Sequence, residues 1–410
     1  MGSLPLNPNW APERVRSNFR LDLFAGICAG VFIAVLNAFM AVEVRRAGGS
    51  TSEVALVVAA PFIGHLVSPF LVYLFQGMPP VRVVSATVLA SRLVFIVGVL
   101  VATTPLFLAA TTVVSFVIVL GNIAAYTGVM VGIYPDRERA TAMGKVRIGV
   151  SIAGIASAAL AGVFIDVVPA GWVFAVAAVL SLPGVVAFWR IRHDPGPIEP
   201  RRPASAIVAT VWADRQYRTL LASFVIYGTG NLSNFAVLPI LLIDRYQAPS
   251  TFIGIYAALQ SVAAIVAYYG WGRLLDRRGS LRLTLYNSLL VALIPIAFVT
   301  APDVWWLLPA AIVAGITAAG GELTFHMNAM QLAPRGRVGD YATVNSFLLG
   351  VRGTIAPFLA AMLLGVLPAS AVILVGLSFM GVGLAVMSRA VHERPPALIL
   401  EPEPEPAAAS

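Results

Sequence analysis

Twelve long apolar runs constrain this chain more than any other feature. A helix needs about 20 apolar residues to cross the hydrocarbon core of a bilayer. The runs that meet this requirement are 21–44, 53–76, 81–102, 105–134, 147–167, 170–190, 219–243, 252–272, 281–300, 304–331, 341–366 and 368–389. Open strands cannot satisfy their backbone groups in lipid, so each run is predicted to be a helix. The sequence therefore predicts an all-α polytopic membrane protein with twelve transmembrane helices.

The placement of charged residues predicts how these helices are oriented. Only 11% of the 410 residues are charged and 59% are hydrophobic, whereas soluble domains carry roughly 25% charged residues. With the N-terminus in the cytoplasm, 22 of the 27 basic residues fall on the cytoplasmic side and three in outer loops. Cytoplasmic loops are enriched in Lys and Arg. We therefore expect a multi-pass protein of the cell (inner or plasma) membrane with both termini in the cytoplasm.

The same charge pattern excludes a nucleic-acid-binding protein. The net charge is +8, but the arginines sit in short clusters between apolar runs. They do not form the basic face with interleaved aromatic residues that nucleic acids need.

The chain divides into two halves of six runs each. The predicted order is a cytoplasmic N-terminal segment 1–20, an N-terminal six-helix half 21–190, a cytoplasmic linker 191–218, a C-terminal six-helix half 219–390 and a cytoplasmic tail 391–410. The tail is too polar and Pro-rich to fold, so we expect it to be disordered. Within the linker, residues 204–218 are predicted to form a short amphipathic helix on the membrane.

Several residues recur at an offset of 200 positions, which indicates an internal duplication. The matching pairs are Arg45 and Arg245, Ser50-Thr51 and Ser250-Thr251, Arg82 and Arg282, and Gly121 and Gly321. Six helices with both ends on one side give the two halves the same orientation. We therefore predict parallel repeats about an axis along the membrane normal, with a binding site between them near the midplane.

Residues 272–282, GRLLDRRGSLR, resemble the cytoplasmic-loop signature G-x-L-x-D-R-x-G-x-x-R of the major facilitator superfamily (MFS). They fall between the eighth and ninth runs, as in that family, and PDRERATAMG (135–144) resembles its second characteristic loop. Together with the six-plus-six pattern, the resemblance covers nearly the whole chain. It implies the MFS fold and a cavity lined by the first, fourth, seventh and tenth spans.

The signature loop supplies the candidate gating residues, which are Gly272, Asp276, Arg277, Gly279 and Arg282. Gly272 would let two helices approach closely, and Gly279 would permit a tight turn. Asp276 could cap a facing helix or pair with basic neighbours. The alternative is a solvated loop that only sets the topology.

Glu322 lies inside an apolar run, where a lone carboxylate is costly. It is about fifteen residues before the loop near residue 337, and Arg352 is about fifteen residues after it. An antiparallel hairpin places both at one depth, so we predict a Glu322–Arg352 pair. Such a pair either locks two helices together or, in a cavity, couples protons or binds substrate. His326, one turn after Glu322, is a candidate proton relay.

A second pair of residues shares a depth in the first half. His65 and Arg92 lie fourteen residues before and thirteen after residue 79. Arg92 has no acid at its level, so it is either a brace bonded to His65 and backbone carbonyls or an anion site for a transported carboxylate.

Other polar side chains lie in the spans that, by the resemblance, line the cavity. They are Asn37, Asn122, Tyr126, Tyr227, Asn231 and Asn234. The 200-residue offset pairs Asn122 and Tyr126 with Glu322 and His326, so we expect these four side chains to form opposite walls of one pocket.

These features predict a secondary active transporter that works by alternating access. We expect proton-coupled efflux of a moderately hydrophobic small molecule, because Glu322 and His326 titrate and no nucleotide-binding motif occurs. The alternatives are uptake or exchange of an organic anion, favoured by Arg92 and Arg352, and a non-transporting scaffold or receptor. We expect no enzymatic activity, because no His/Asp or His/Glu cluster at catalytic spacing faces a loop. We also expect no cofactor or metal, and a monomer whose partners are its substrate, protons and the lipid bilayer.

Overall fold

The computed structural model describes residues 11–75, 77–194, 204–334 and 337–392. In chain order its elements are α1 (Pro12–Arg46), α2 (Thr51–Leu74), α3 (Pro80–Val101), α4 (Pro105–Leu120), α5 (Ile123–Ile133), α6 (Asp136–Phe164), α7 (Ala170–Trp189), α8 (Ala204–Ala213), α9 (Arg215–Asp244), α10 (Ser250–Arg278), α11 (Ser280–Val291), α12 (Leu293–Thr300), the 3₁₀ turn η2 (Val304–Leu307), α13 (Leu308–Leu332), α14 (Val338–Leu364) and α15 (Ala369–His392). Within the described residues there is no strand, and eleven helical stretches are long and apolar enough to span a membrane. Counting α4 and α5 as one broken span gives twelve. The predicted all-α multi-pass architecture is confirmed.

Hydrophobic length explains most of these elements, but it did not predict the break in the fourth span. The apolar run 105–134 is divided into α4 and α5, which are bent by 43°. The interruption falls at Gly121 and Asn122. The Asn122 side chain donates to the Thr87 hydroxyl of α3 at 2.9 Å, so this polar contact lies at the bend.

Two borders differ from the sequence prediction. α1 begins at Pro12, so residues 12–20 of the predicted N-terminal segment extend the first helix. The helix predicted within 204–218 is present as α8, but residues from Arg215 onward belong to α9. Residues 195–203 of the linker and 393–410 of the tail lie outside the described part of the chain.

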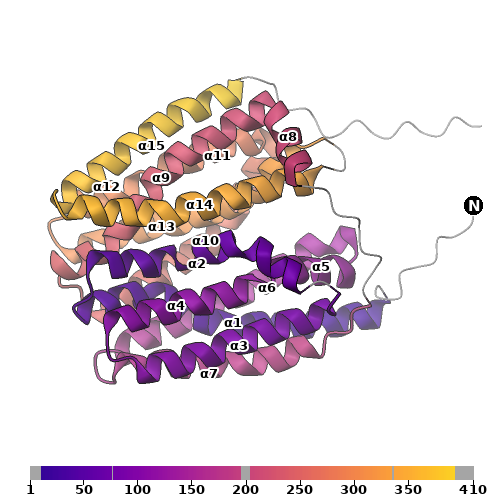
Figure 1. The fold of residues 1–410 in the computed structure, drawn as a ribbon, viewed down its shortest axis with the longest axis horizontal. Helices are drawn as coiled ribbons and strands as arrows, with labels where there is room; N and C mark the ends of the chain where they lie inside the picture. Colours follow the sequence, from indigo (N-terminus) through magenta and orange to yellow (C-terminus); the bar gives the residue numbers. More distant parts are fainter. Residues whose placement is uncertain (1–10, 76, 195–203, 335–336, 393–410) are drawn as a thin grey trace, which may run out of the picture.

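The two halves repeat one another, as predicted, and lie one above the other in Figure 1. In the N-terminal half the Asn18 amide donates to the Arg192 carbonyl at 2.9 Å. In the C-terminal half the Gln216 amide donates to the Ala390 carbonyl at 2.9 Å. Asn18 and Gln216 are 198 positions apart in the sequence, and so are Arg192 and Ala390. The same bond therefore ties the first span of each half to the end of its last span.

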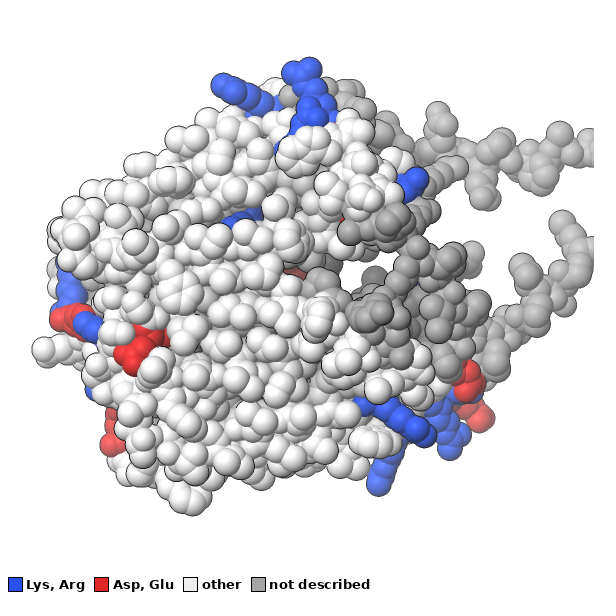
Figure 2. All heavy atoms as spheres, viewed as in Figure 1, with Lys and Arg blue, Asp and Glu red and all other residues white. Residues whose placement is uncertain are grey.

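Aromatic and charged residues mark the two ends of the helix bundle. We call the end where α1 begins and α15 ends the terminal end, and the opposite end the far end. Figure 2 shows charged side chains gathered at both ends, with little charge on the flank between them. Exposed tryptophans sit at the far end (Trp172, Trp305, Trp306) and at the terminal end (Trp189, Trp212). Tryptophan is enriched at membrane interfaces, so the uncharged flank is the part that faces lipid.

Small residues bring the two halves into backbone contact. Gly162 of α6 faces Gly254 of α10, and a Cβ on Gly162 would lie 2.7 Å from the Ser250 carbonyl. A Cβ on Gly254 would likewise lie 2.7 Å from the carbonyl of Ala158. α2 and α14 form the second lateral contact between the halves. These interfaces enclose the space in which the candidate site lies.

Candidate functional site

A cavity of about 570 Å³ lies between the two halves, where the repeat predicted a site. Its walls come from α1, α2, α4 and α6 of the N-terminal half and from α9 to α13 of the C-terminal half. The volume falls within the range of small-molecule binding sites. Both halves line it, so relative motion of the halves would change its shape and access.

The cavity wall is apolar with several neutral polar groups. Three of the predicted residues, Asn37, Asn231 and Asn234, line it, together with Gln260 and Tyr256. Among the described lining residues none is Asp, Glu, Lys, Arg or His. Asn234 is only 2% exposed, and its side chain lies over Gly376 of α15. Its Oδ1 accepts no hydrogen bond within the described chain.

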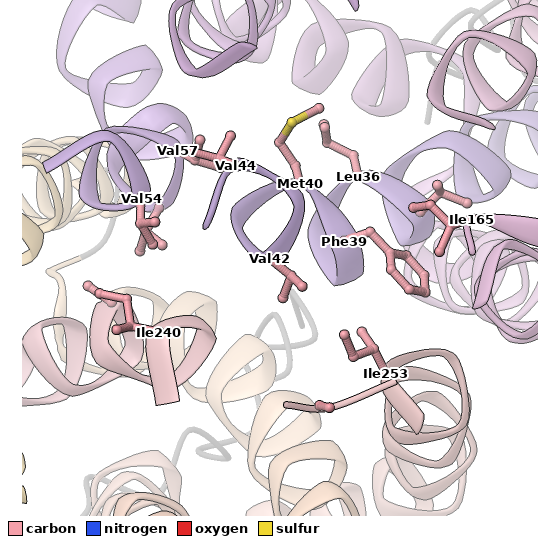
Figure 3. Packing of buried hydrophobic residues seen from close by; sticks show 14 of the residues in the cluster. Leu36, Phe39, Met40, Val42, Val44, Val54, Val57, Ile165, Ile240 and Ile253 are labelled. Atoms are coloured by element: carbon pink, nitrogen blue, oxygen red, sulfur yellow. The ribbon is translucent and has the colours of Figure 1, made fainter. Parts of the chain in front are cut away.

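The far end of the cavity is closed by apolar packing. Figure 3 shows Phe39 and Val42 of α1 facing Ile240 of α9 and Ile253 of α10. All four are at most 5% exposed and belong to one cluster that joins the halves. In the observed conformation these side chains pack together between the halves.

Charged groups reinforce the closure at the far end. Arg45 pairs with Asp244 of α9, with its Nε donating to Oδ1 at 2.9 Å. Arg46 donates to the Ala248 carbonyl at 2.6 Å and also bonds the Ser250 hydroxyl. Each of these bonds joins the N-terminal half to the C-terminal half. The structure is therefore a conformer that is shut at the far end.

Glu322 is paired, but not with the residue predicted. Its Oε1 lies 3.4 Å from Nε of Arg147, on α6 in the other half. Its Oε2 accepts a hydrogen bond from the Tyr268 hydroxyl of α10. The Glu322 side chain is 40% exposed and that of Arg147 is 57% exposed. The ion pair of Glu322 therefore joins the two halves, whereas the predicted pair would have joined two helices of the same half.

The predicted Glu322–Arg352 pair is wrong because α13 and α14 are not close packing neighbours. α13 packs chiefly on α10 and α11, whereas α14 packs on α2 and α9. Arg352 instead donates to the Phe224 carbonyl and lies over the Phe224 ring, 5.5 Å from its centroid. Gly228 leaves the space for it, since a Cβ there would lie 2.8 Å from Arg352 Cδ.

Arg92 contacts other helices of its own half, but it is not bonded to His65. It is 4% exposed, and its Nε donates to the Ser181 hydroxyl of α7 at 3.0 Å. Its guanidinium lies 3.8 Å from the centroid of the Phe32 ring of α1. α2, which carries His65, packs chiefly on α4 and α14, while α3 packs on α4 and α7. Arg92 does not line the cavity, so no observation favours an anion site there.

Asn122, Tyr126 and Tyr227 lie outside the cavity, so the prediction that Asn122 and Tyr126 form one of its walls is wrong. Tyr126 stacks on Phe188 with ring centroids 6.0 Å apart, and the Tyr227 hydroxyl donates to the Ser288 carbonyl at 2.9 Å. Their roles are interhelical contacts.

Asn122 corresponds in structure to Asn328 rather than to Glu322. Asn328 of α13 donates to the Thr284 hydroxyl of α11 at 2.9 Å. This bond joins the tenth span to the ninth, as the Asn122–Thr87 bond joins the fourth to the third. The offset of 200 positions therefore paired Asn122 with the wrong residue of the tenth span.

In the candidate gating loop, the turn expected at Gly279 is present, whereas the close helix contact expected at Gly272 is absent. Gly279 has φ 75°, the left-handed conformation that a tight turn between α10 and α11 requires. Gly272 makes no close helix contact, because a Cβ there would meet nothing within 4 Å. Arg277 and Arg282 are exposed. The side chains of Asp276 and His326 lie outside the described part of the chain.

Sequence reasoning missed Arg147, Tyr268 and Asp22. Arg147 opens a predicted run and was counted only as a topology-setting charge. Asp22, in α1, is 2% exposed and accepts a hydrogen bond from the Tyr134 hydroxyl at 2.9 Å. A carboxylate at the start of an apolar run was a signal that could have identified it.

The fold and the cavity between its halves define the class as a multi-pass membrane transporter. Residues 23–357 match the sequence model of the Major Facilitator Superfamily, so the chain belongs to this family. No curated protein matches the sequence.

Solved structures share the fold at low sequence identity. One is the nucleoside transporter NupG, with TM-score 0.66 and 14% identity over 93% of this chain and 100% of that chain. Another is a bacterial homologue of the human lysosomal transporter Spinster, in an inward-facing and unoccupied conformation, with TM-score 0.62 and 14% identity over 95% and 98%. A third is a POT family transporter in complex with a thioalcohol-conjugated peptide, with TM-score 0.71 and 14% identity over 93% and 97%.

Proposed function

We propose that this protein is a proton-coupled secondary transporter that exports a neutral, moderately hydrophobic small molecule. The observation that carries the proposal is the Arg147–Glu322 ion pair, which joins the two halves of a bundle whose central cavity has no charged group among its described lining residues. The ion pair and the uncharged binding surface are therefore separate sites, so a change at Glu322 can bias the positions of the halves without direct contact with the substrate.

The cavity chemistry favours an uncharged substrate. Asn37, Asn231 and Gln260 offer amide donors and acceptors within an otherwise apolar wall. A charged solute would lose its hydration there without a compensating ion. Arg92 and Arg352, which made an organic anion the main alternative, are bonded within their own halves. These contacts weigh against the anion.

Protonation of Glu322 supplies the coupling. A neutral carboxyl no longer attracts Arg147, so proton binding favours conformers in which the two side chains are apart. An ion pair this exposed contributes roughly 0.2–1 kcal/mol, which shifts a two-state equilibrium by at most about fivefold. Proton binding therefore shifts the equilibrium between the two conformers of the halves only in part. Substrate bound in the cavity shifts it further.

The direction of the helices follows from their charges. At the terminal end α10 finishes with the exposed Arg277 and Arg278, and α15 finishes with Arg389 in its last turn. We propose that this end faces the cytoplasm of a cell (inner or plasma) membrane, since basic residues concentrate on that side. The observed conformer, shut at the far end, is then closed to the outside.

Transport into proteoliposomes tests the coupling. A thermal-shift screen of uncharged drugs, sugars and organic acids first selects the ligand, which is then used in flux assays under an imposed pH gradient. We expect wild-type protein to accumulate it and Glu322→Gln to allow only downhill equilibration. Glu13→Gln, which neutralises an exposed acid in the first turn of α1, is the matched control and should behave as wild type.

Each alternative has its own outcome in this assay. Wild-type flux that is insensitive to the pH gradient contradicts proton coupling. Selection of an organic acid, with flux lost in well-folded Arg92→Gln, supports the anion alternative. Ligand binding without any flux supports the non-transporting receptor.

A further inference from the structure

The outer surface of the C-terminal half carries a groove of about 770 Å³ between α10 and α13. Its walls are mainly apolar, and Val262, Val266 and Ile312 in it are 45%, 67% and 42% exposed. Trp271 also lines the groove, with its indole nitrogen bonded to the Ile316 carbonyl at 2.7 Å. Gly270 widens it, because no atom lies within 4 Å of the position that a Cβ would take.

This groove faces the bilayer, away from the transport cavity. Its residues on α10 recur every three or four positions, including Val262, Val266, Arg273 and Arg277, and so lie on one helix face. Tyr268 points from another face of the same helix toward Glu322 in the bundle interior. Because α10 spans the membrane and this apolar face of it points outward, the groove is exposed to lipid.

Two arginines stand at one end of the groove. Arg273 and Arg277 are one turn apart, both are exposed, and both belong to its lining. They lie in the last two turns of α10, which ends at Arg278 at the terminal end. No described residue forms an ion pair or a hydrogen bond with the side chain of either arginine. The groove thus has an apolar slot at membrane depth and two available cations at the interface.

We propose that this groove binds an anionic phospholipid. Arg273 and Arg277 hold its phosphate, and one acyl chain runs along Val266 and Val262 beside α13. From Arg273 back to Leu259, the last groove residue on α10, fourteen residues rise about 21 Å. That distance exceeds one leaflet's share of the hydrocarbon core, about 15 Å. Basic pockets between spanning helices are suited to anionic headgroups, and a soluble phosphate would leave the apolar slot empty.

Native mass spectrometry of the full-length protein in detergent tests the site. The protein is titrated with phosphatidylglycerol and with phosphatidylcholine that carries the same acyl chains. We expect one phosphatidylglycerol to bind at least fivefold more tightly than phosphatidylcholine. The double variant R273Q/R277Q should lose this preference, and Val266→Trp, which fills the slot, should weaken binding of both lipids. Arg278→Gln removes a neighbouring charge that does not line the groove and should leave the preference unchanged.

Three results would overturn the proposal. Equal affinity of the wild type for the two lipids removes the role of the headgroup charge. An equal loss in Arg278→Gln indicates general attraction to basic residues. Displacement of the lipid by glycerol phosphate at equal concentration shows a site for a free phosphate. Melting temperatures of all variants establish that each remains folded.

Discussion

At the scale of single residues, the charges inside the membrane are stabilised in different ways. Arg92 and Arg352 have no carboxylate partner among the described residues, and each instead combines a polar oxygen of a neighbouring helix with an aromatic ring. Glu322 has a guanidinium and a phenol as partners, both from other helices. Neutral dipoles and ring faces can therefore hold a buried cation, whereas the partners of Glu322 include a residue of the other half.

The brace at Arg92 predicts a stability effect at Ser181. Ser181→Ala removes the oxygen that accepts from the Arg92 Nε, which leaves a buried charged donor unsatisfied. We expect a loss of roughly 1–3 kcal/mol in stability, measured as a lower melting temperature in detergent. Ser157→Ala is the control, because the Ser157 hydroxyl bonds only its own helix, at Gly154. Equal effects of the two substitutions would show that Arg92 does not depend on Ser181.

The sequence located the intramembrane charges but not their partners. Counting residues from a turn gives depth along the membrane normal, and depth alone suggested that Glu322 meets Arg352. Lateral position depends on which helices pack together, and successive helices here often pack on others instead. Asn37 and Asn231 were placed correctly because the family resemblance supplied the missing lateral assignment.

At the scale of helices, α6 and α10 form one of the two lateral contacts between the halves. Gly162→Val would place new atoms against the Ser250 carbonyl and Gly254, which are both backbone and cannot rotate away. We expect overpacking to cost about 1–3 kcal/mol and to lower transport by separating the helices. Melting temperature and flux in proteoliposomes measure the two effects.

Gly144 provides the matched control for that experiment. It also lies in α6, but a Cβ there would meet nothing within 4 Å. Gly144→Val should therefore leave the stability within about 1 kcal/mol of wild type, because Val has a somewhat higher helix propensity than the Gly it replaces. Equal damage at both positions would mean that α6 tolerates no β-branched residue, whatever the position of α10.

Helix existence was predictable, while helix interruptions were not. Hydrophobic length is a sum over about twenty residues, so each apolar run predicted its span. The break between α4 and α5 falls at Gly121 and Asn122, where Asn122 bonds Thr87. The hydrophobicity summed over the run does not register such a local feature. The sequence predicted one short helix within 204–218, whereas the structure has α8 over Ala204–Ala213 and a separate α9 that Asp214 caps.

At the scale of the whole molecule, alternating access requires the far end to open. The apolar layer that includes Phe39 and Ile253 must part, and so must the polar contacts around Arg45 and Arg46. The side chains of Arg45 and Asp244 are 25% and 42% exposed, so their pair contributes roughly 0.2–1 kcal/mol. An ion pair this weak favours the conformer that is closed at the far end, but it does not prevent the far end from opening.

Removing one of these contacts should increase the population that is open at the far end. Asp244→Asn keeps the side-chain shape but removes the charge that attracts Arg45. We expect up to a fivefold rise in access to the cavity from the far side, since about 1 kcal/mol corresponds to that factor. Cys28 is the only cysteine, so Cys28→Ser gives a background in which Ala41→Cys, at the cavity wall, reports access through its labelling by a membrane-impermeant maleimide.

The charge-swapped variant separates electrostatics from packing in this experiment. R45D/D244R reverses both partners and restores their attraction, although it loses the Arg45 bond to the Gly49 carbonyl. Labelling of the swapped variant should therefore fall back toward the wild-type rate, while Arg45→Asp alone should label at least as fast as Asp244→Asn. If all three variants label at the wild-type rate, the apolar layer alone holds the far end shut. The ion pair would then have no part in setting the balance between the two conformers.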